Sequence, residues 1–355
     1  MRKFYCLLIA AFLCGYAFEG YGQLNRKAIK KNNRRIGSYR GQKSHFGKDK
    51  IYNAVGFSLN ALNYYGDLAP KPSRFSTDIS FTRPAIGLSF SHRFGPRYTL
   101  TGAFTYGTLT GSDTESADKF DSENGIFRYK RNLSFRNRIK ELSIVASFDL
   151  FENMATYISR VKWTPYAFAG LAVFHHKPQA QAPDTDVNGN PLAEAGEWVD
   201  LHALGTEGQN ASLASTDANS GMKAYKLIQP AIPFGLGVRF RINEVMDLAG
   251  EVGFRYLFTD YIDDVSKNYV DLGYFGNNEL AKAMSYRGNE ITEFASMRES
   301  YVSSVDGRTY STLPGYGREH PENLRGNDGD RDIYMVTTIR LTYILGKTFH
   351  RAKFR

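Results

Sequence analysis

The residues with the clearest catalytic potential are His175 and His176, which stand together at the end of an apolar run. An imidazole that activates a serine hydroxyl is the core of nucleophilic catalysis, and at a membrane interface it would serve a lipid-modifying enzyme. Serines are plentiful in the polar segments, yet no Ser, His and acid stand at a spacing that suggests such a constellation. A surface histidine pair is the simpler interpretation, so we expect no catalytic residues and no enzyme.

Acidic residues gather in the second half of the chain, in two polar segments. Alternating carboxylates with Gly and Asn can ligate calcium through oxygen. Neither group follows the spacing of an EF-hand loop, and solvated turn residues are the alternative interpretation. We therefore expect no metal and no other cofactor. The two groups are Asp260, Asp263 and Asp264, and Asp328, Asp330 and Asp332.

The first 23 residues have the layout of a secretory signal peptide. Arg2 and Lys3 precede an apolar run over 4–18, and small residues follow it at 20–22. A bilayer-spanning helix needs about 20 apolar residues, so a membrane anchor is the weaker interpretation. Both cysteines of the chain, Cys6 and Cys14, lie inside this segment. We therefore expect a mature chain with neither disulfides nor thiolate metal sites.

The positive charge is placed at the two ends of the expected mature chain. The chain carries a formal net charge of +9, and residues 24–50 hold ten Lys and Arg against one Asp. Residues 347–355 add four more basic side chains, which leaves the body mildly acidic. Such asymmetry indicates tails that meet an anionic partner or surface. The candidate partner-binding residues are Lys30, Lys31, Arg34 and Arg35 in the arm, and Lys347, Arg351, Lys353 and Arg355 in the tail.

From residue 51 onward, apolar side chains alternate with polar or small ones, which is the pattern of half-buried strands. The run at 166–174 is apolar on both faces, so its facing stays ambiguous. Short and long connections alternate strictly along the chain, and the architecture of a soluble β-sandwich does not explain this alternation. The apolar-alternating runs are 55–61, 86–91, 98–106, 141–150, 166–174, 234–242, 248–258 and 333–343. Short connections are 94–97, 151–163 and 243–247, and long ones are 62–84, 107–138, 175–231 and 259–331.

This pattern predicts an all-β fold, an eight-stranded antiparallel transmembrane β-barrel over 51–346 with short periplasmic turns and long extracellular loops. An even strand number puts both termini in the periplasm of a cell with an outer membrane. The predicted inner face carries charges of both signs, and a barrel of eight strands is just wide enough for its own side chains. We therefore expect ion pairs that fill the lumen and no porin. The predicted lumen charges are Glu141, Asp149, Arg239, Arg241, Glu251, Arg255 and Arg340.

Several stretches in fixed order carry a family resemblance. They are RNLSFR at 131–136, ELS at 141–143, WVDL at 198–201, LGTEG at 204–208, IPFGLGV at 232–238 and FTDYIDDVS at 258–266. Together they resemble the PorG-like outer-membrane barrels of Bacteroidetes. The resemblance covers residues 52–346, and the arm at 24–50 and the tail at 347–355 depart from it. It implies a non-enzymatic component of the type IX secretion system that meets the periplasmic ring, built from a lipoprotein and its partner subunit.

Other partners remain open for the exposed parts of the chain. The basic arm would also be attracted to anionic lipid of the outer membrane, and a barrel with long loops could be an adhesin or another binding barrel. Nucleic acid is excluded, because the arm offers no stacking platform beyond Tyr39 and Phe46 and lies in the wrong compartment. In the 151–163 turn, Arg160 and Lys162 are further candidates for docking a periplasmic partner.

Overall fold

The computed structural model describes residues 46, 50–69, 81–329 and 331–346. All of these belong to one compact unit, residues 46–355. The expected signal peptide at 1–23, nearly all of the arm at 24–50 and the tail at 347–355 lie outside the described residues.

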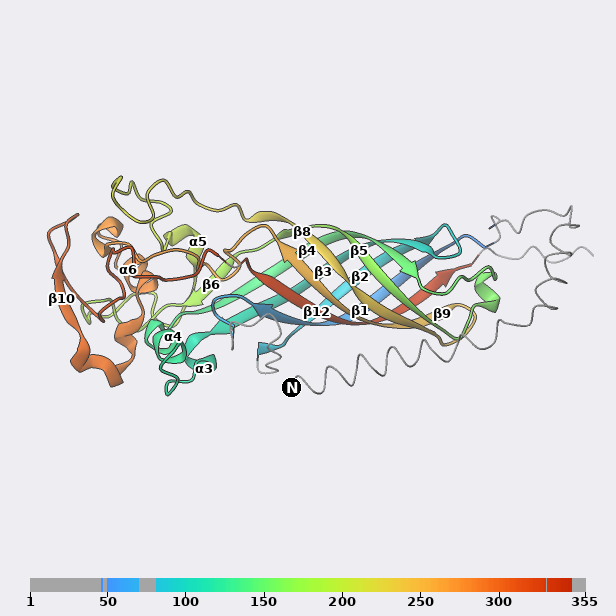
Figure 1. Ribbon diagram of the computed structural model, residues 1–355, viewed down its shortest axis with the longest axis horizontal. Helices are drawn as coiled ribbons and strands as arrows, with labels where there is room; N and C mark the ends of the chain where they lie inside the picture. Colours follow the sequence, from blue (N-terminus) through green and yellow to red (C-terminus); the bar gives the residue numbers. More distant parts are fainter. Residues whose placement is uncertain (1–45, 47–49, 70–80, 330, 347–355) are drawn as a thin grey trace, which may run out of the picture. The chain divides into compact units, whose positions relative to one another are not determined.

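Eight long antiparallel strands close into a barrel (Figure 1). Each strand pairs with its neighbour around the ring in the order β3-β2-β1-β12-β9-β8-β5-β4, and a pairing of β3 with β4 closes it. The predicted all-β transmembrane fold is thus confirmed in strand number, direction and closure. The barrel strands are β1 (Tyr52–Tyr65), β2 (Arg83–Arg93), β3 (Tyr98–Ser112), β4 (Ser134–Asp149), β5 (Trp163–His175), β8 (Ile228–Arg241), β9 (Met246–Leu257) and β12 (Ile333–Leu345).

The two ends of the barrel differ in the length of their connections. At one end, here called the turn end, the strands join through 94–97, 150–162 and 242–245. At the other, the loop end, they join through 66–82, 113–133, 176–227 and 258–332. The predicted sorting into short turns and long loops is therefore confirmed.

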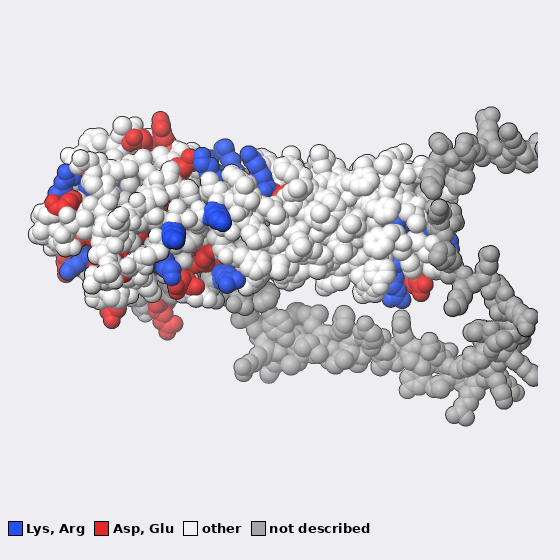
Figure 2. All heavy atoms as spheres, turned by 90° about the horizontal axis from the view of Figure 1, so that it is seen from above, with Lys and Arg blue, Asp and Glu red and all other residues white. Residues whose placement is uncertain are grey.

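The outer face of the barrel is an apolar belt. Inward and outward side chains alternate along each strand, and large apolar side chains point outward from all eight. Figure 2 shows a stretch of barrel surface with hardly any charged side chain between the two ends. A soluble protein does not expose so large a patch, whereas lipid covers it at no cost. The belt includes Phe57, Leu59, Leu88, Phe90, Phe104, Leu142, Ile144, Leu171, Leu236, Val252, Ile339 and Leu341.

The structure resolves one open question about the strands and corrects one expectation. The run at 166–174, ambiguous in the sequence, turns Leu171 outward at 72% exposure and buries Phe174 completely inside. In addition, β3 and β4 extend beyond the predicted ends, so that the loop between them is shorter than 107–138. The extensions are stable because their inward side chains, Leu109 and Phe135, enter a packed apolar core.

The three longest loops, 113–133, 176–227 and 258–332, form a cap of short elements at the loop end (Figure 1). None of the helices in the described part of the chain is both long enough and apolar enough to span a membrane. The cap elements are α3 (Asp113–Ser116), α4 (Gly125–Arg131), β6 (Pro178–Gln181), β7 (Trp198–Asp200), α5 (Leu201–Leu204), η4 (Leu272–Phe275), α6 (Glu279–Ser285), η5 (Gly288–Glu290), η6 (Thr292–Met297), β10 (Glu299–Val302) and β11 (Thr309–Thr312); η3 (Tyr157–Ser159) lies at the turn end.

Candidate functional site

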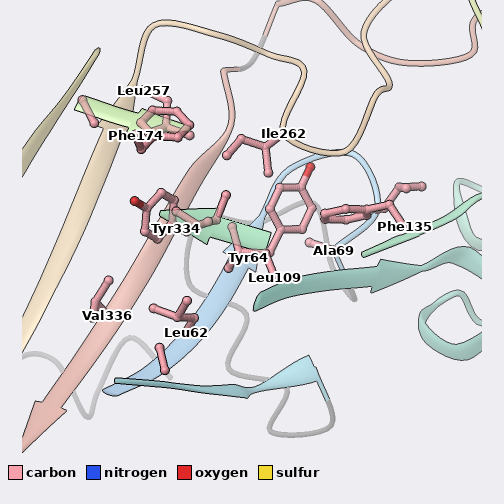
Figure 3. Close-up of a cluster of buried hydrophobic side chains, with 14 of the residues drawn as sticks. Leu62, Tyr64, Ala69, Leu109, Phe135, Phe174, Leu257, Ile262, Tyr334 and Val336 are labelled. Atoms are coloured by element: carbon pink, nitrogen blue, oxygen red, sulfur yellow. The ribbon is translucent and has the colours of Figure 1, made fainter. Parts of the chain in front are cut away.

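The loop end of the barrel is closed by a core of buried apolar side chains (Figure 3). Strand residues such as Leu62, Phe174 and Tyr334 meet loop residues such as Leu68 and Ile262 there. Burial of this much apolar surface is strongly stabilising and excludes water. We call this cluster the loop-end core, and it separates the lumen from the cap.

Below this core, ion pairs fill the lumen, as predicted. Cavities among these side chains include two of about 40 Å³ each, which is room for a few water molecules. Arg241 differs from the expectation, because it donates to the backbone carbonyls of Arg160 and Asn243. The pairs are Arg93–Asp149 at 2.7 Å, Arg239–Asp149 at 3.5 Å, Arg255–Glu141 at 3.0 Å and Arg340–Glu251 at 2.8 Å.

Glu141 and Glu251 are the centres of this lumen network. Glu141 accepts from Arg255 Nε at 3.0 Å and from the hydroxyl of Tyr334 at 2.5 Å. Glu251 accepts from the hydroxyl of Tyr166 at 2.6 Å as well as from Arg340. A buried carboxylate with both a cation and a hydroxyl donor is well satisfied, so this network rigidifies the barrel.

A group of carboxyls lies against the loop-end core. Asp263 and Asp332 are buried, and each has a carboxyl oxygen 2.7 Å from the hydroxyl of Tyr64. Burial raises the pKa of both carboxyls well above the usual range, and each is also raised by neighbouring carboxyls. Burial likewise raises the pKa of Asp67 to about 6 and that of Asp260 to about 9. We call Asp67, Asp260, Asp263 and Asp332 the mouth carboxyls.

This burial corrects the expectation for the loop aspartates, which are not all solvated turn residues. Asp264 accepts from the hydroxyls of Thr206 and Tyr225, the latter at 2.6 Å. Asp328 does stay exposed, where it pairs with Lys267. Among the described residues, no group of three or more His, Cys, Asp or Glu is arranged to hold a metal ion.

Two buried arginines join the loops at the loop end to one another, and neither was predicted from the sequence. Arg131 pairs with Asp113 at 2.8 Å and donates to the carbonyls of Asp67 and Arg325. Arg325 pairs with Glu207 at 3.1 Å. Arg131 and Glu207 lie in the stretches that carry the family resemblance, and this resemblance was the sequence feature that could have identified them. These contacts tie four loops together, namely 66–82, 113–133, 176–227 and 258–332.

The adjacent histidines are not the surface pair expected from the sequence, because one of them is buried. His176 is fully buried, its ring stacks on Tyr225 at 5.7 Å, and its Nε2 lies 3.1 Å from the carbonyl of Lys226. Burial lowers the pKa of His176 to about 4, so the ring is neutral at physiological pH. Within the described residues, no serine hydroxyl or carboxylate contacts either imidazole, and His176 is part of an aromatic stack that includes Tyr261.

The two docking candidates at the turn end differ in exposure. Arg160 is only 6% exposed, pairs with Asp247 at 2.6 Å and donates to the carbonyls of Asn243 and Glu244. Its guanidinium is held by these groups of the turn end, and its docking role stays a prediction. Lys162 is exposed and stays a candidate. The other candidates, Lys30, Lys31, Arg34, Arg35, Lys347, Arg351, Lys353 and Arg355, lie outside the described residues.

The cap also contains a cleft of about 240 Å³. Asp217 and Asp271 lie at its buried side, and Tyr274, Tyr301 and Arg318 line it. The Arg318 guanidinium lies 5.6 Å from the centre of the Tyr301 ring. Aromatic faces beside charged groups are suited to a small polar ligand.

Comparisons with known proteins find a family model that matches part of the chain and solved structures with low sequence identity to it. Residues 44–191 match the family described as "Domain of unknown function (DUF6089)". No curated protein matches the chain. Similar solved structures include a major outer membrane protein of Thermus thermophilus (8% identity, covering 82% of this chain and 99% of that one, TM-score 0.35).

Two further solved structures are similar at the same level. OprG of Pseudomonas aeruginosa has 8% identity, covers 84% of this chain and 98% of its own, and has a TM-score of 0.32. Neisserial surface protein A has 7% identity, covers 83% and 96%, and has a TM-score of 0.32. The fold assignment therefore stands on the strand pairing described above.

Proposed function

We propose that this protein is a non-enzymatic outer-membrane component of the type IX protein secretion system that anchors its periplasmic ring complex. The observation that carries the proposal is the filled barrel. Ion pairs such as Arg255–Glu141 occupy the lumen, and the loop-end core closes its end. A barrel filled by its own side chains, with no catalytic constellation among the residues that the structure describes, would act through the surfaces it presents on either side of the membrane.

The family resemblance supports the secretion role within that class. Its stretches at 131–136, 204–208 and 258–266 supply Arg131, Glu207 and the buried aspartates that organise the cap. The resemblance is thus made of residues that build this particular loop end. A PorG-like barrel would place its turn end in the periplasm and its cap outside the cell.

The partner expected at the turn end is the periplasmic ring lipoprotein with its partner subunit. Positive charge in the arm, in the tail and at Lys162 would steer an acidic partner and hold it less firmly as salt screens the attraction. Anionic outer-membrane lipid is the alternative partner for the arm.

Co-purification of a tagged barrel from detergent-solubilised membranes tests the proposal. We expect recovery of the ring subunits with wild type, and reduced recovery after deletion of 347–355 or neutralisation of Lys30, Lys31, Arg34 and Arg35. Lys162→Gln is a further variant, and Lys223→Gln in the exposed cap is its charge-matched control. Full recovery of the ring subunits with every variant would show that these cations do not form the docking surface. Absence of ring subunits from the wild-type sample would contradict the anchoring function.

A binding barrel or adhesin is the second candidate, and the cleft of about 240 Å³ in the cap favours it. In this function an external ligand would occupy the cleft beside Tyr274 and Tyr301. Tyr301→Ala should then reduce binding of whole cells to their substratum while export is unchanged. Unchanged binding would leave the anchor as the only candidate.

A further inference from the structure

The outward face of β4 changes character where the strand leaves the apolar belt. Leu142 and Ile144 point outward in the belt, and the next outward residues toward the loop end are Lys140, Arg138 and Arg136. The intervening residues point inward and are buried, as Phe135 and Ile139 in the loop-end core show. Because side chains alternate along a strand, the three cations share the face of Leu142 and must point away from the barrel. We call Arg136, Arg138 and Lys140 the β4 cationic strip.

The β4 cationic strip is short of acidic partners. Within the described residues, Arg138 and Lys140 form no ion pair and no side-chain hydrogen bond. Their register partners on β3 are Thr108 and Tyr106, and the partner of Lys140 on β5 is His175. None of these neighbours carries a negative charge. Asp200 lies across β6 from the strip in the register, and it is already held by Lys177 at 2.5 Å and by Gln179 at 2.7 Å.

Arg136 is held in place at the end of the strip. Its guanidinium lies 3.6 Å from the centre of the Trp198 ring, and its Nη2 donates to Gln179 at 2.9 Å. The Nε of Arg136 is buried without a hydrogen-bond partner among the described residues. Stacking on an aromatic ring fixes the plane of the guanidinium, and a fixed guanidinium suits recognition of phosphate oxygens. Tryptophan side chains such as that of Trp198 are also enriched at the boundary between lipid and water.

We infer that the β4 cationic strip binds the phosphate group of an anionic lipid in the leaflet that surrounds the loop end. Figure 2 shows Lys and Arg side chains gathered where the uncharged stretch of the barrel meets the cap. Lipid tails lie against Leu142 and Ile144, so a lipid in contact with the belt presents its phosphate at the level of Lys140 and Arg138. The inference rests on the barrel spanning a membrane, as proposed above, but not on its role in secretion.

Fluorescence quenching by labelled lipid can test this inference, because the chain has two tryptophans and one of them belongs to the site. Trp163→Phe leaves Trp198 as the reporter beside Arg136. The full chain with this substitution is folded into phosphatidylcholine vesicles that contain one part in five of brominated phosphatidic acid or of brominated phosphatidylcholine. The ratio of quenching by the two lipids gives the relative affinity of the site for the anionic headgroup.

We expect a clear preference for phosphatidic acid that weakens at high salt. Each Lys or Arg near an anionic surface contributes about fivefold in affinity, so Arg138→Gln with Lys140→Gln should lower the preference roughly 25-fold. Lys119→Gln with Arg308→Gln removes two cap cations that already pair with Glu293 and Glu279, and should leave it unchanged.

Three outcomes would overturn the inference. These are equal quenching by the two lipids, equal loss of preference in the cap control, and full competition by inorganic phosphate at millimolar concentration. Failure of the barrel itself is distinguishable, because a chain outside the bilayer would be quenched by neither brominated lipid.

Discussion

The hydroxyl of Tyr64 lies 2.7 Å from a carboxyl oxygen of Asp263 at the loop end of the barrel. A carboxyl oxygen of Asp332 lies at the same distance from that hydroxyl. A phenol has one hydrogen to donate, so the second contact is a hydrogen bond only if one carboxyl is protonated and donates to the phenol oxygen. The raised pKa of both carboxyls agrees with this proton count.

The first prediction is that stability falls as pH rises above about 4. The mouth carboxyls have raised pKa values in the folded protein, about 9 for Asp260, so the folded state holds protons that the unfolded chain releases near its ordinary pKa of about 4. Their contribution is therefore fully present below pH ~4 and is lost toward pH ~9. Each extra proton bound changes the free energy of unfolding by about 1.4 kcal/mol per pH unit.

Urea unfolding from lipid vesicles between pH 4 and pH 9 measures this slope. Asp332→Asn should flatten it, because an amide donates to Tyr64 without titrating. The exposed Asp184→Asn is the control and should keep the wild-type slope. Burial of neutral His176 adds a slope of the opposite sign in both proteins, so the comparison with Asp332→Asn is decisive, and equal slopes in wild type and Asp332→Asn would contradict the shared proton.

The second prediction concerns the lumen network. Glu141→Gln should destabilise the barrel by about 3–5 kcal/mol, because it leaves Arg255 buried beside a neutral amide. Arg255→Gln added to Glu141→Gln should recover part of the loss, since the uncompensated charge is then gone. Urea unfolding measures both, with the exposed Glu197→Gln as a neutral control. Additive losses in the double variant would show that the pair is not coupled.

Alternation in the sequence was sufficient to predict the barrel, because the facing of a residue such as Leu236 depends only on its strand neighbours. It was not sufficient for β5, where Leu171 and Phe174 are both apolar and only the closed ring decides which one meets lipid. The burial of Asp264 was also beyond reach. Its partners Thr206 and Tyr225 come from another loop, and long-range contacts leave no local pattern.

The third prediction compares two leucines of similar exposure. Leu236 in the belt is 67% exposed and Leu324 in the cap is 58% exposed. Leu236→Arg should cost about 2–4 kcal/mol in bilayers, because it places a charge among lipid tails, whereas Leu324→Arg should cost less than about 0.5 kcal/mol. Unfolding from vesicles measures both. Equal costs would contradict the assignment of the belt to lipid.

The fourth prediction concerns orientation. Asn243 lies exposed at the turn end and Asn190 lies exposed in the cap, and the expected mature chain has no cysteine. Single cysteines at these positions should react differently with a membrane-impermeant maleimide on intact cells. We expect labelling of Asn190→Cys alone, and both variants should label after the cells are broken. Labelling of Asn243→Cys on intact cells would show that the barrel has the opposite orientation in the membrane.

Protein export is the process that the proposed secretion role makes dependent on this barrel. The gene is deleted, and the amount of type IX cargo in the culture medium is compared with the amount retained in the cell. We expect cargo to accumulate in the periplasm of the deletion strain, and expression of the wild-type barrel to restore its release. Normal release of cargo by the deletion strain would contradict the secretion role.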